Sequence, residues 1–391
     1  MKTSKIFTYP LFALGFRPFF LLAGLSALML MLLWNAMVKG NIAGVAYYPG
    51  SSWHAHEMLL GYCVAVIAGF LLTAVRNWTG QETLTGDRLA SLCLLWLYGR
   101  VVPFYADTFP ASLIALIDFI FLPLLAWQVA KPIIHTGNWR NLGFVGLLLL
   151  MAGGNALVHA QLLGWLPNSL TTGLQLEVYT ITLMILFIAG RIFPFFTERG
   201  LPGMLAMRNP QLDVLSIVAA LLVFALLLAD VAGAWLAAAA VLAVIANLLR
   251  VAGWYVLRVW YVPLLWILYT GYAWIIIGFG LVALHAFAWV AADLALHAFT
   301  VGGIGLLTLG MMARVALGHT GRALQASNAM AIAFGLLNVA VVLRVLCPLA
   351  WQGGLMLFIY VATLLWLAAF ALFMVVYAPI LIAPRVDGNE G

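Results

Sequence analysis

The sequence has little charge. Asp, Glu, Lys and Arg make up 8% of its 391 residues, whereas hydrophobic residues make up 66%. No soluble domain can bury so much apolar side chain, but a lipid bilayer accepts it. The composition therefore excludes a soluble globular protein, and we expect the lipid bilayer as its surroundings and no nucleic-acid partner.

Cysteine is also scarce. Cys63, Cys93 and Cys347 are the only three, and neither a CxxC pair nor a CxxCH motif occurs. The sequence therefore supports neither a thiolate zinc site nor covalent attachment of a c-type haem. The N-terminal apolar segment lacks a small-residue cleavage pattern, so we expect a retained first membrane span, not a cleaved signal.

Long apolar runs fill the chain, and a membrane span needs about 20 such residues. The pattern predicts an all-α, polytopic membrane protein with twelve transmembrane helices. Because the connections are short, we expect one integral membrane domain over residues 1–391. The predicted spans are residues 18–38, 57–75, 88–105, 110–130, 140–162, 174–196, 211–230, 233–250, 262–284, 294–316, 328–347 and 354–380.

The positive residues predict the orientation of these spans. With the N-terminus inside, all but three of the 18 Lys and Arg residues fall on the inner side. The exceptions are Lys39, Arg100 and Arg344. Since short cytoplasmic loops carry an excess of Lys and Arg, we expect both termini in the cytoplasm.

Five of the seven histidines lie at the outer ends of predicted spans: His54, His56, His159, His285 and His297. A histidine at the membrane edge is a functional-site hypothesis, and neutral imidazole is the commonest metal ligand in proteins. His56 and His297 stand at equivalent depth, near the outer ends of the second and tenth spans. We expect them to ligate a non-covalent haem b from both sides.

His54 lies two positions before His56, about 200° around a helix, so the two side chains cannot face one ligand. Two interpretations of His54 stay open. It forms a second metal site with His159, containing copper or a second haem, or it is a hydrogen-bonded interfacial histidine.

Arg100 and Arg344 lie near the outer ends of their spans. A guanidinium group binds a carboxylate in bidentate fashion, so both are candidates for contacts with haem propionates. The alternative is an ion pair with Asp118 or Glu177, or a side chain that reaches the surface. Glu177 itself could orient a ligand, carry protons or simply be exposed.

A repeat relates the second, sixth and tenth spans. In each, twelve residues separate an ionisable residue from a glycine, in the ranges 56–69, 177–190 and 297–310. The spacing is compatible with three four-helix pseudo-repeats about an axis along the membrane normal.

Four motifs together resemble the NnrS family of bacterial membrane proteins. They occupy residues 14–20, 53–58, 69–80 and 311–322, and the number of spans agrees over nearly the full length. The resemblance implies a haem- and copper-containing protein of the bacterial inner membrane. It also implies a role in nitric oxide metabolism or tolerance to nitrosative stress, with nitric oxide or another small molecule as ligand and a quinol or cytochrome as electron donor.

A weaker resemblance is to the catalytic subunit of haem–copper oxidases and nitric oxide reductases. That subunit also has twelve spans, with haem ligands on the second and tenth. Here Phe299 stands where the tenth span would carry its second histidine, and the sixth and seventh spans lack histidines. A standard binuclear oxygen-reducing centre is therefore not expected.

Two other functions remain alternatives. The first is a secondary transporter without a redox centre, because internal repeats are common in transporters. The second is a membrane sensor that binds haem without turnover. Transporters usually carry polar groups in mid-span, whereas here the ionisable groups gather at the outer ends, which favours a metal centre.

Overall fold

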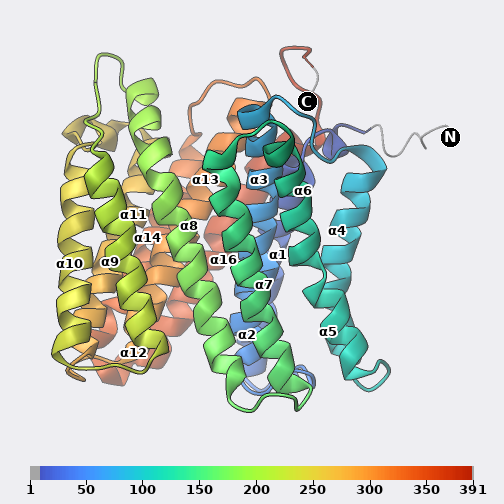
Figure 1. Ribbon diagram of the computed structural model, residues 1–391, viewed down its shortest axis with the longest axis vertical. Helices are drawn as coiled ribbons and strands as arrows, with labels where there is room; N and C mark the ends of the chain where they lie inside the picture. Colours follow the sequence, from blue (N-terminus) through green and yellow to red (C-terminus); the bar gives the residue numbers. More distant parts are fainter. Residues whose placement is uncertain (1–8, 390–391) are drawn as a thin grey trace. The chain divides into compact units, whose positions relative to one another are not determined.

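The computed structural model describes residues 9–389, and no strand occurs among them (Figure 1). The chain forms two compact units. Unit 1 contains residues 1–177, 312–324 and 370–391, and unit 2 contains residues 178–311 and 325–369. Three helices contribute residues to both units: α8 (Ser169–Gly200), α13 (Leu306–His319) and α16 (Leu355–Ile382).

Unit 1 carries most of the N-terminal half of the chain. Its elements are η2 (Pro10–Phe12), α1 (Phe16–Val38), α2 (Ser52–His56), η3 (Glu57–Cys63), α3 (Val64–Thr79), α4 (Gly86–Val101), η4 (Val102–Tyr105), α5 (Ala111–Phe119), α6 (Phe121–His135), η5 (Trp139–Asn141), α7 (Leu142–Leu162), the beginning of α8 (Ser169–Gly200) and the ends of α13 and α16.

Unit 2 carries the rest. Its elements are the remainder of α8, α9 (Pro210–Leu228), α10 (Ala234–Ala252), η6 (Leu257–Tyr261), α11 (Pro263–His285), α12 (Ala292–His297), η7 (Ala298–Gly305), the beginning of α13 (Leu306–His319), α14 (Asn328–Val345), α15 (Cys347–Ala350), η8 (Gln352–Gly354) and most of α16 (Leu355–Ile382).

Eleven helices of the described chain are long and apolar enough to cross a membrane. The remaining predicted span, residues 88–105, forms α4, whose 16 residues continue into the 3₁₀ turn η4. The sequence-based prediction of an all-helical, polytopic membrane protein is thus confirmed, and each predicted span contains a helix.

Glycines let the helices of unit 1 approach one another closely. A Cβ atom at Gly173 of α8 would lie 2.5 Å from the carbonyl oxygen of Gly154 on α7, and one at Gly99 of α4 would lie 3.0 Å from Oδ1 of Asp118 on α5. A larger side chain at either position would push two helices apart. These contacts hold α7 against α8 and α4 against α5.

Two π-helices interrupt the α-helical hydrogen bonding, and each directly follows a histidine. The π-helix η3 begins after His56, the last residue of α2, and the π-helix η7 begins after His297, the last residue of α12. Single-turn π segments occur frequently at functional sites. Both histidines of the predicted repeat therefore share one local architecture, whereas Glu177 lies within the uninterrupted helix α8.

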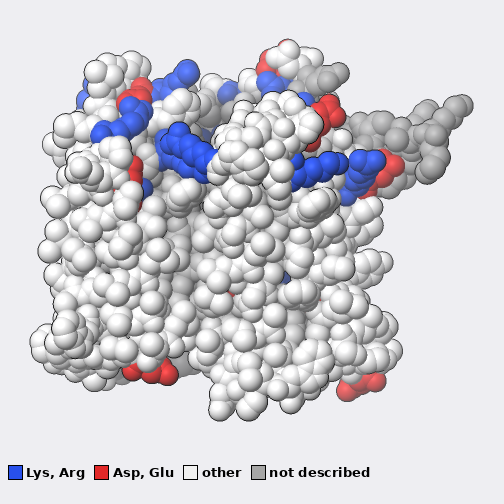
Figure 2. Space-filling view, in the orientation of Figure 1, with Lys and Arg blue, Asp and Glu red and all other residues white. Residues whose placement is uncertain are grey.

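The charged side chains lie mainly near the two ends of the helices. In each unit, Lys and Arg gather at one end of the helices on the face seen in Figure 2, together with some acidic side chains, and further acidic side chains are visible at the opposite end. The apolar surface between the two ends matches the part of a membrane protein that faces lipid.

Candidate metal centre

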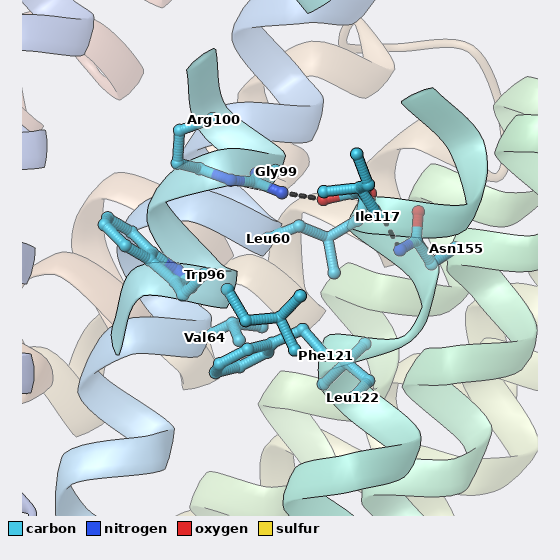
Figure 3. Close-up of a pocket in the computed structure, with 11 residues that line it drawn as sticks. Leu60, Val64, Trp96, Gly99, Arg100, Ile117, Phe121, Leu122 and Asn155 are labelled. Carbon is cyan, nitrogen blue, oxygen red and sulfur yellow. Dashed lines mark hydrogen bonds and ion pairs between the residues drawn. The ribbon is translucent and has the colours of Figure 1, made fainter. Parts of the chain in front are cut away.

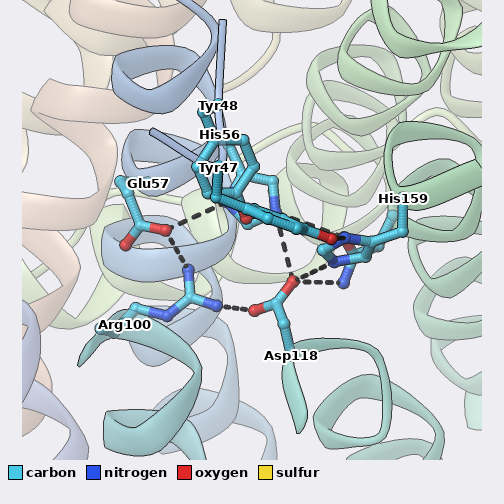
Figure 4. Close-up of polar contacts among 8 residues, drawn as sticks. Tyr47, Tyr48, His56, Glu57, Arg100, Asp118 and His159 are labelled. Atoms are coloured by element: carbon cyan, nitrogen blue, oxygen red, sulfur yellow. Dashed lines mark hydrogen bonds and ion pairs between the residues drawn. The ribbon is translucent and has the colours of Figure 1, made fainter. Parts of the chain in front are cut away.

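Eight polar side chains meet inside unit 1 (Figure 4). They come from the loop between α1 and α2, from α2 itself and from η3, α4, α5 and α7, and all but Arg100 are buried. The eight are Tyr47, Tyr48, His56, Glu57, Arg100, Asp118, Asn155 and His159.

The carboxylate of Asp118 lies at the centre of this cluster. Its Oδ2 atom is 2.9 Å from Nε2 of His159 and 3.2 Å from Nε2 of His56, and it accepts a hydrogen bond of 2.9 Å from the Asn155 side chain. Its other oxygen, Oδ1, forms an ion pair with Arg100. One carboxylate thus joins helices α2, α4, α5 and α7.

His56 lies between two carboxylates. Its Nδ1 is 3.1 Å from Oε1 of Glu57, and its Nε2 faces Asp118. Glu57 Oε1 also accepts a hydrogen bond of 2.9 Å from Arg100. A neutral imidazole has one N–H, so it can donate to only one of the two acids. If Nδ1 donates to Glu57, the lone pair of Nε2 lies beside the Asp118 carboxylate, where it can accept a hydrogen bond from the Tyr48 hydroxyl at 3.2 Å or bind a metal ion.

His159 also lies between two polar partners, but one of them is a neutral hydroxyl, that of Tyr47, in place of a second carboxylate. Its Nδ1 is 2.9 Å from the hydroxyl of Tyr47, while its Nε2 faces Asp118. If Nδ1 of each histidine carries the proton, the Glu57 carboxylate and the Tyr47 hydroxyl accept it. Both Nε2 lone pairs then converge on Oδ2 of Asp118. Such outer partners typically fix the tautomer and orientation of metal-binding histidines.

The three converging atoms are close enough to share one ion. The ligand atoms of His56, Asp118 and His159 all lie within 4.8 Å of one another, and all three residues are buried. Two imidazole nitrogens and a carboxylate oxygen form a set that suits copper, zinc or iron. Three protein ligands also leave a coordination position for an exogenous ligand, as in catalytic metal sites.

The charges in the cluster favour a bound cation. Among the eight residues of Figure 4, Glu57 and Asp118 are acidic and Arg100 is the one permanent cation, so neutral histidines leave one negative charge in excess. An uncompensated charge is costly in a buried site. Burial also raises the pKa of the Tyr47 and Tyr48 hydroxyls, so both stay protonated.

The structure brings two of the predicted metal ligands together, His56 and His159, whose ring centroids are 5.8 Å apart. His54 lies elsewhere and stacks on Trp34, with ring centroids 4.6 Å apart. Arg100 pairs with Asp118, as one of the two sequence interpretations predicted.

The other predicted residues, His297 and Arg344, meet in unit 2. Nδ1 of His297 donates to the backbone oxygen of Asp293 at 2.7 Å, so its Nε2 is the acceptor facing Nη2 of Arg344 at 3.1 Å. The same Nη2 lies 3.2 Å from the carboxylate of Asp293. His56 and His297 therefore each have a set of partners in their own unit, and their joint ligation of one haem stays a prediction.

Glu177 is not exposed, contrary to one of its three sequence interpretations. Its side chain is fully buried, and neither carboxyl oxygen has a hydrogen-bond partner among residues 9–389. A Cβ atom added to Gly154 would lie 2.8 Å from Oε1 of Glu177, so the carboxyl group packs directly against α7. A buried acid without an ion partner favours its neutral, protonated form.

Sequence reasoning identified Asp118 only as a partner for Arg100, and it gave no role to Glu57, Tyr47 or Asn155. A signal for Asp118 was present, because it is the one acidic residue in the apolar segment 110–130. An acid within a membrane span is a functional-site hypothesis by default. Nothing local indicated Tyr47 and Asn155, which join the site only through packing.

A family model described as NnrS protein matches residues 10–385. No curated protein matches the chain.

Proposed function

The chain belongs to the NnrS protein family, and from this membership we propose that it is a membrane metalloprotein of the nitric oxide response. In this proposal His56, His159 and Asp118 hold a copper ion. Among the metals that suit this ligand set, the family resemblance favours copper. The observation that carries the proposal is the convergence of two imidazole nitrogens on one carboxylate oxygen, in a buried cluster with one excess negative charge.

The geometry suits an ion better than a haem at this centre. The side chain of His56 is fully buried, and the Tyr48 ring lies 4.6 Å from its ring, so no face of the imidazole is open to a large planar group. The cavity beside Asp118 has a volume of about 10 Å³, which holds about one water molecule, whereas ligand pockets for larger molecules measure about 300–1,000 Å³. We therefore assign His56 to the ion in this proposal.

His297 is the better candidate for a haem ligand. Its side chain is only partly buried, and its Nδ1 is held by a backbone carbonyl. Its Nε2 would coordinate the iron once Arg344 exchanges its contact with this nitrogen for one with a propionate. A haem supplies an iron that binds nitric oxide. Ligation of one haem by His56 and His297 together remains the alternative, and the experiment below separates the two.

The proposal also covers the membrane in which the protein lies, its orientation and its electron donor. We infer that the protein lies in the bacterial inner membrane with the Lys- and Arg-rich end of its helices in the cytoplasm, since cytoplasmic loops are enriched in these residues. A quinol or a cytochrome would then supply electrons from within or beside the membrane.

The test is metal and haem analysis of the purified full-length protein and its variants. We expect one copper ion per chain in the wild type, and its loss in His56→Ala, His159→Ala and Asp118→Asn. His54→Ala is the matched control, because its ring stacks on Trp34 outside the centre, and it should retain copper.

The haem absorption band should disappear in His297→Ala and persist in His56→Ala. Loss of the band in both variants would favour joint ligation instead. A wild type with no copper or zinc, and no iron beyond that of its haem, would contradict the metal centre. When the variants are expressed in cells from which the native protein has been deleted, the His54→Ala protein should restore tolerance to nitric oxide. The Asp118→Asn protein should not.

A further inference from the structure

A small cavity adjoins the proposed metal centre within unit 1 (Figure 3). Its volume of about 10 Å³ is room for about one water-sized molecule. Arg100, Asp118 and Asn155 form its polar end, and Asp118 is one of the three proposed metal ligands. The cavity is therefore next to the atoms that would hold the ion.

The rest of the cavity wall is apolar. It is formed by side chains from η3, α3, α4 and the α5–α6 segment, among them Trp96, Phe121 and Leu122. Apolar walls favour a neutral molecule, because a charged one would lose its hydration there without a partner.

Helix α4 lines the cavity with one side and is exposed on the other. Leu95 and Trp96 line the cavity, whereas Leu94 and Leu97 on the same helix are 53% and 42% exposed. This exposed face is apolar, as expected of a surface that meets lipid. A small apolar molecule dissolved in the bilayer would thus need to pass only one layer of side chains.

We propose that this cavity is the docking site of a neutral diatomic gas, which reaches the metal centre from the lipid past α4. This inference rests on the proposed function, because the ligand binds an ion held by Asp118 and the two histidines. The step is association only: one coordinate bond forms between the gas and the ion at its open position, and no bond breaks.

Stopped-flow measurement of nitric oxide binding to the copper-loaded protein tests whether the gas docks in this cavity. Leu122→Phe adds a ring at the wall, and Val64→Ile adds one methylene as a milder change. We expect the association rate to fall on the order of tenfold in Leu122→Phe, the effect of raising the barrier by about 1.4 kcal/mol. Leu248→Phe places a ring on the exposed side of α10 in unit 2, outside the cavity wall, and should leave the rate unchanged.

Copper content is measured first for every variant. This measurement distinguishes failure of the proposed metal centre from failure of the proposed docking cavity. A wild type without a metal ion would overturn both. Copper-loaded Leu122→Phe and Val64→Ile proteins that bind nitric oxide at the wild-type rate would overturn only the docking of the gas in this cavity. If the Leu122→Phe protein does not fold, the Val64→Ile protein provides the test. A slower association rate of nitric oxide would support docking in the cavity, and an unchanged rate would reject it.

Discussion

Replacement of Asp118 by Asn is the change that probes the centre most directly. The carboxylate accepts contacts from His56, His159 and Asn155 through one oxygen and pairs with Arg100 through the other. An amide keeps the shape of the side chain but removes its charge. The substitution therefore tests charge and ligation without creating a cavity.

The expected loss in metal affinity is at least about 100-fold, because changes to the outer partners of metal ligands alone cost about 10- to 100-fold. The loss corresponds to about 2.7 kcal/mol of binding free energy. Removing one partner of a buried ion pair typically destabilises a protein by about 3–5 kcal/mol. Arg100 keeps Glu57 at 2.9 Å, and the substitution also removes the excess negative charge. We therefore expect a loss of about 3 kcal/mol or less in metal-free protein.

The assay is copper titration together with thermal unfolding, with and without copper. At free copper 100 times above its dissociation constant, the wild type should gain about 2.7 kcal/mol in the free energy of unfolding, and Asp118→Asn should gain much less. Asp293→Asn is the matched control, because it also faces an arginine but is 47% exposed. Asp118→Asn protein that binds copper with wild-type affinity would refute the reasoning.

Three further substitutions give distinct expected results. Tyr47→Phe removes the hydroxyl that holds Nδ1 of His159 at 2.9 Å, and competition titration should show copper affinity reduced by about 10- to 100-fold; an unchanged affinity would argue against the assigned tautomer. Glu177→Gln should abolish the infrared carbonyl band of a protonated buried carboxyl group, and a spectrum without that band in the wild type would contradict the neutral acid. Arg17 is fully buried and donates hydrogen bonds to two carbonyl oxygens at the end of α16. Arg17→Ala leaves both oxygens without that donor and should lower the free energy of unfolding by about 1–3 kcal/mol. The unfolding midpoint should therefore be lower than that of the lipid-facing control Leu97→Ala.

The positions of the helices were predictable because a membrane span is a local property of the chain. About 20 apolar residues in a row suffice, whatever the rest of the fold does. The predicted spans 18–38 and 354–380 became α1 (Phe16–Val38) and α16 (Leu355–Ile382). Helix α4 is the shortest span, since Asp87 and Arg88 near its beginning and the turn at Pro103 limit the apolar run.

The π-helices were not predictable from composition. The segment after His56 and the segment after His297 differ from α-helix only in the partner of each backbone N–H, and side-chain hydropathy does not distinguish the two patterns. The repeat of a histidine followed at fixed spacing by a glycine indicated that these two regions correspond. The structure added that both histidines end a short α-helix.

By itself, then, the sequence determined the membrane setting, the order of the helices, and His56, His159 and Arg100 as candidates for chemistry. Only the tertiary structure decided which of these residues meet. His56, Asp118 and His159 come from three separate helices, and they meet only because α2, α5 and α7 pack together in unit 1. Hydropathy acts along each helix separately, whereas a metal site requires atoms from several helices within a few ångströms.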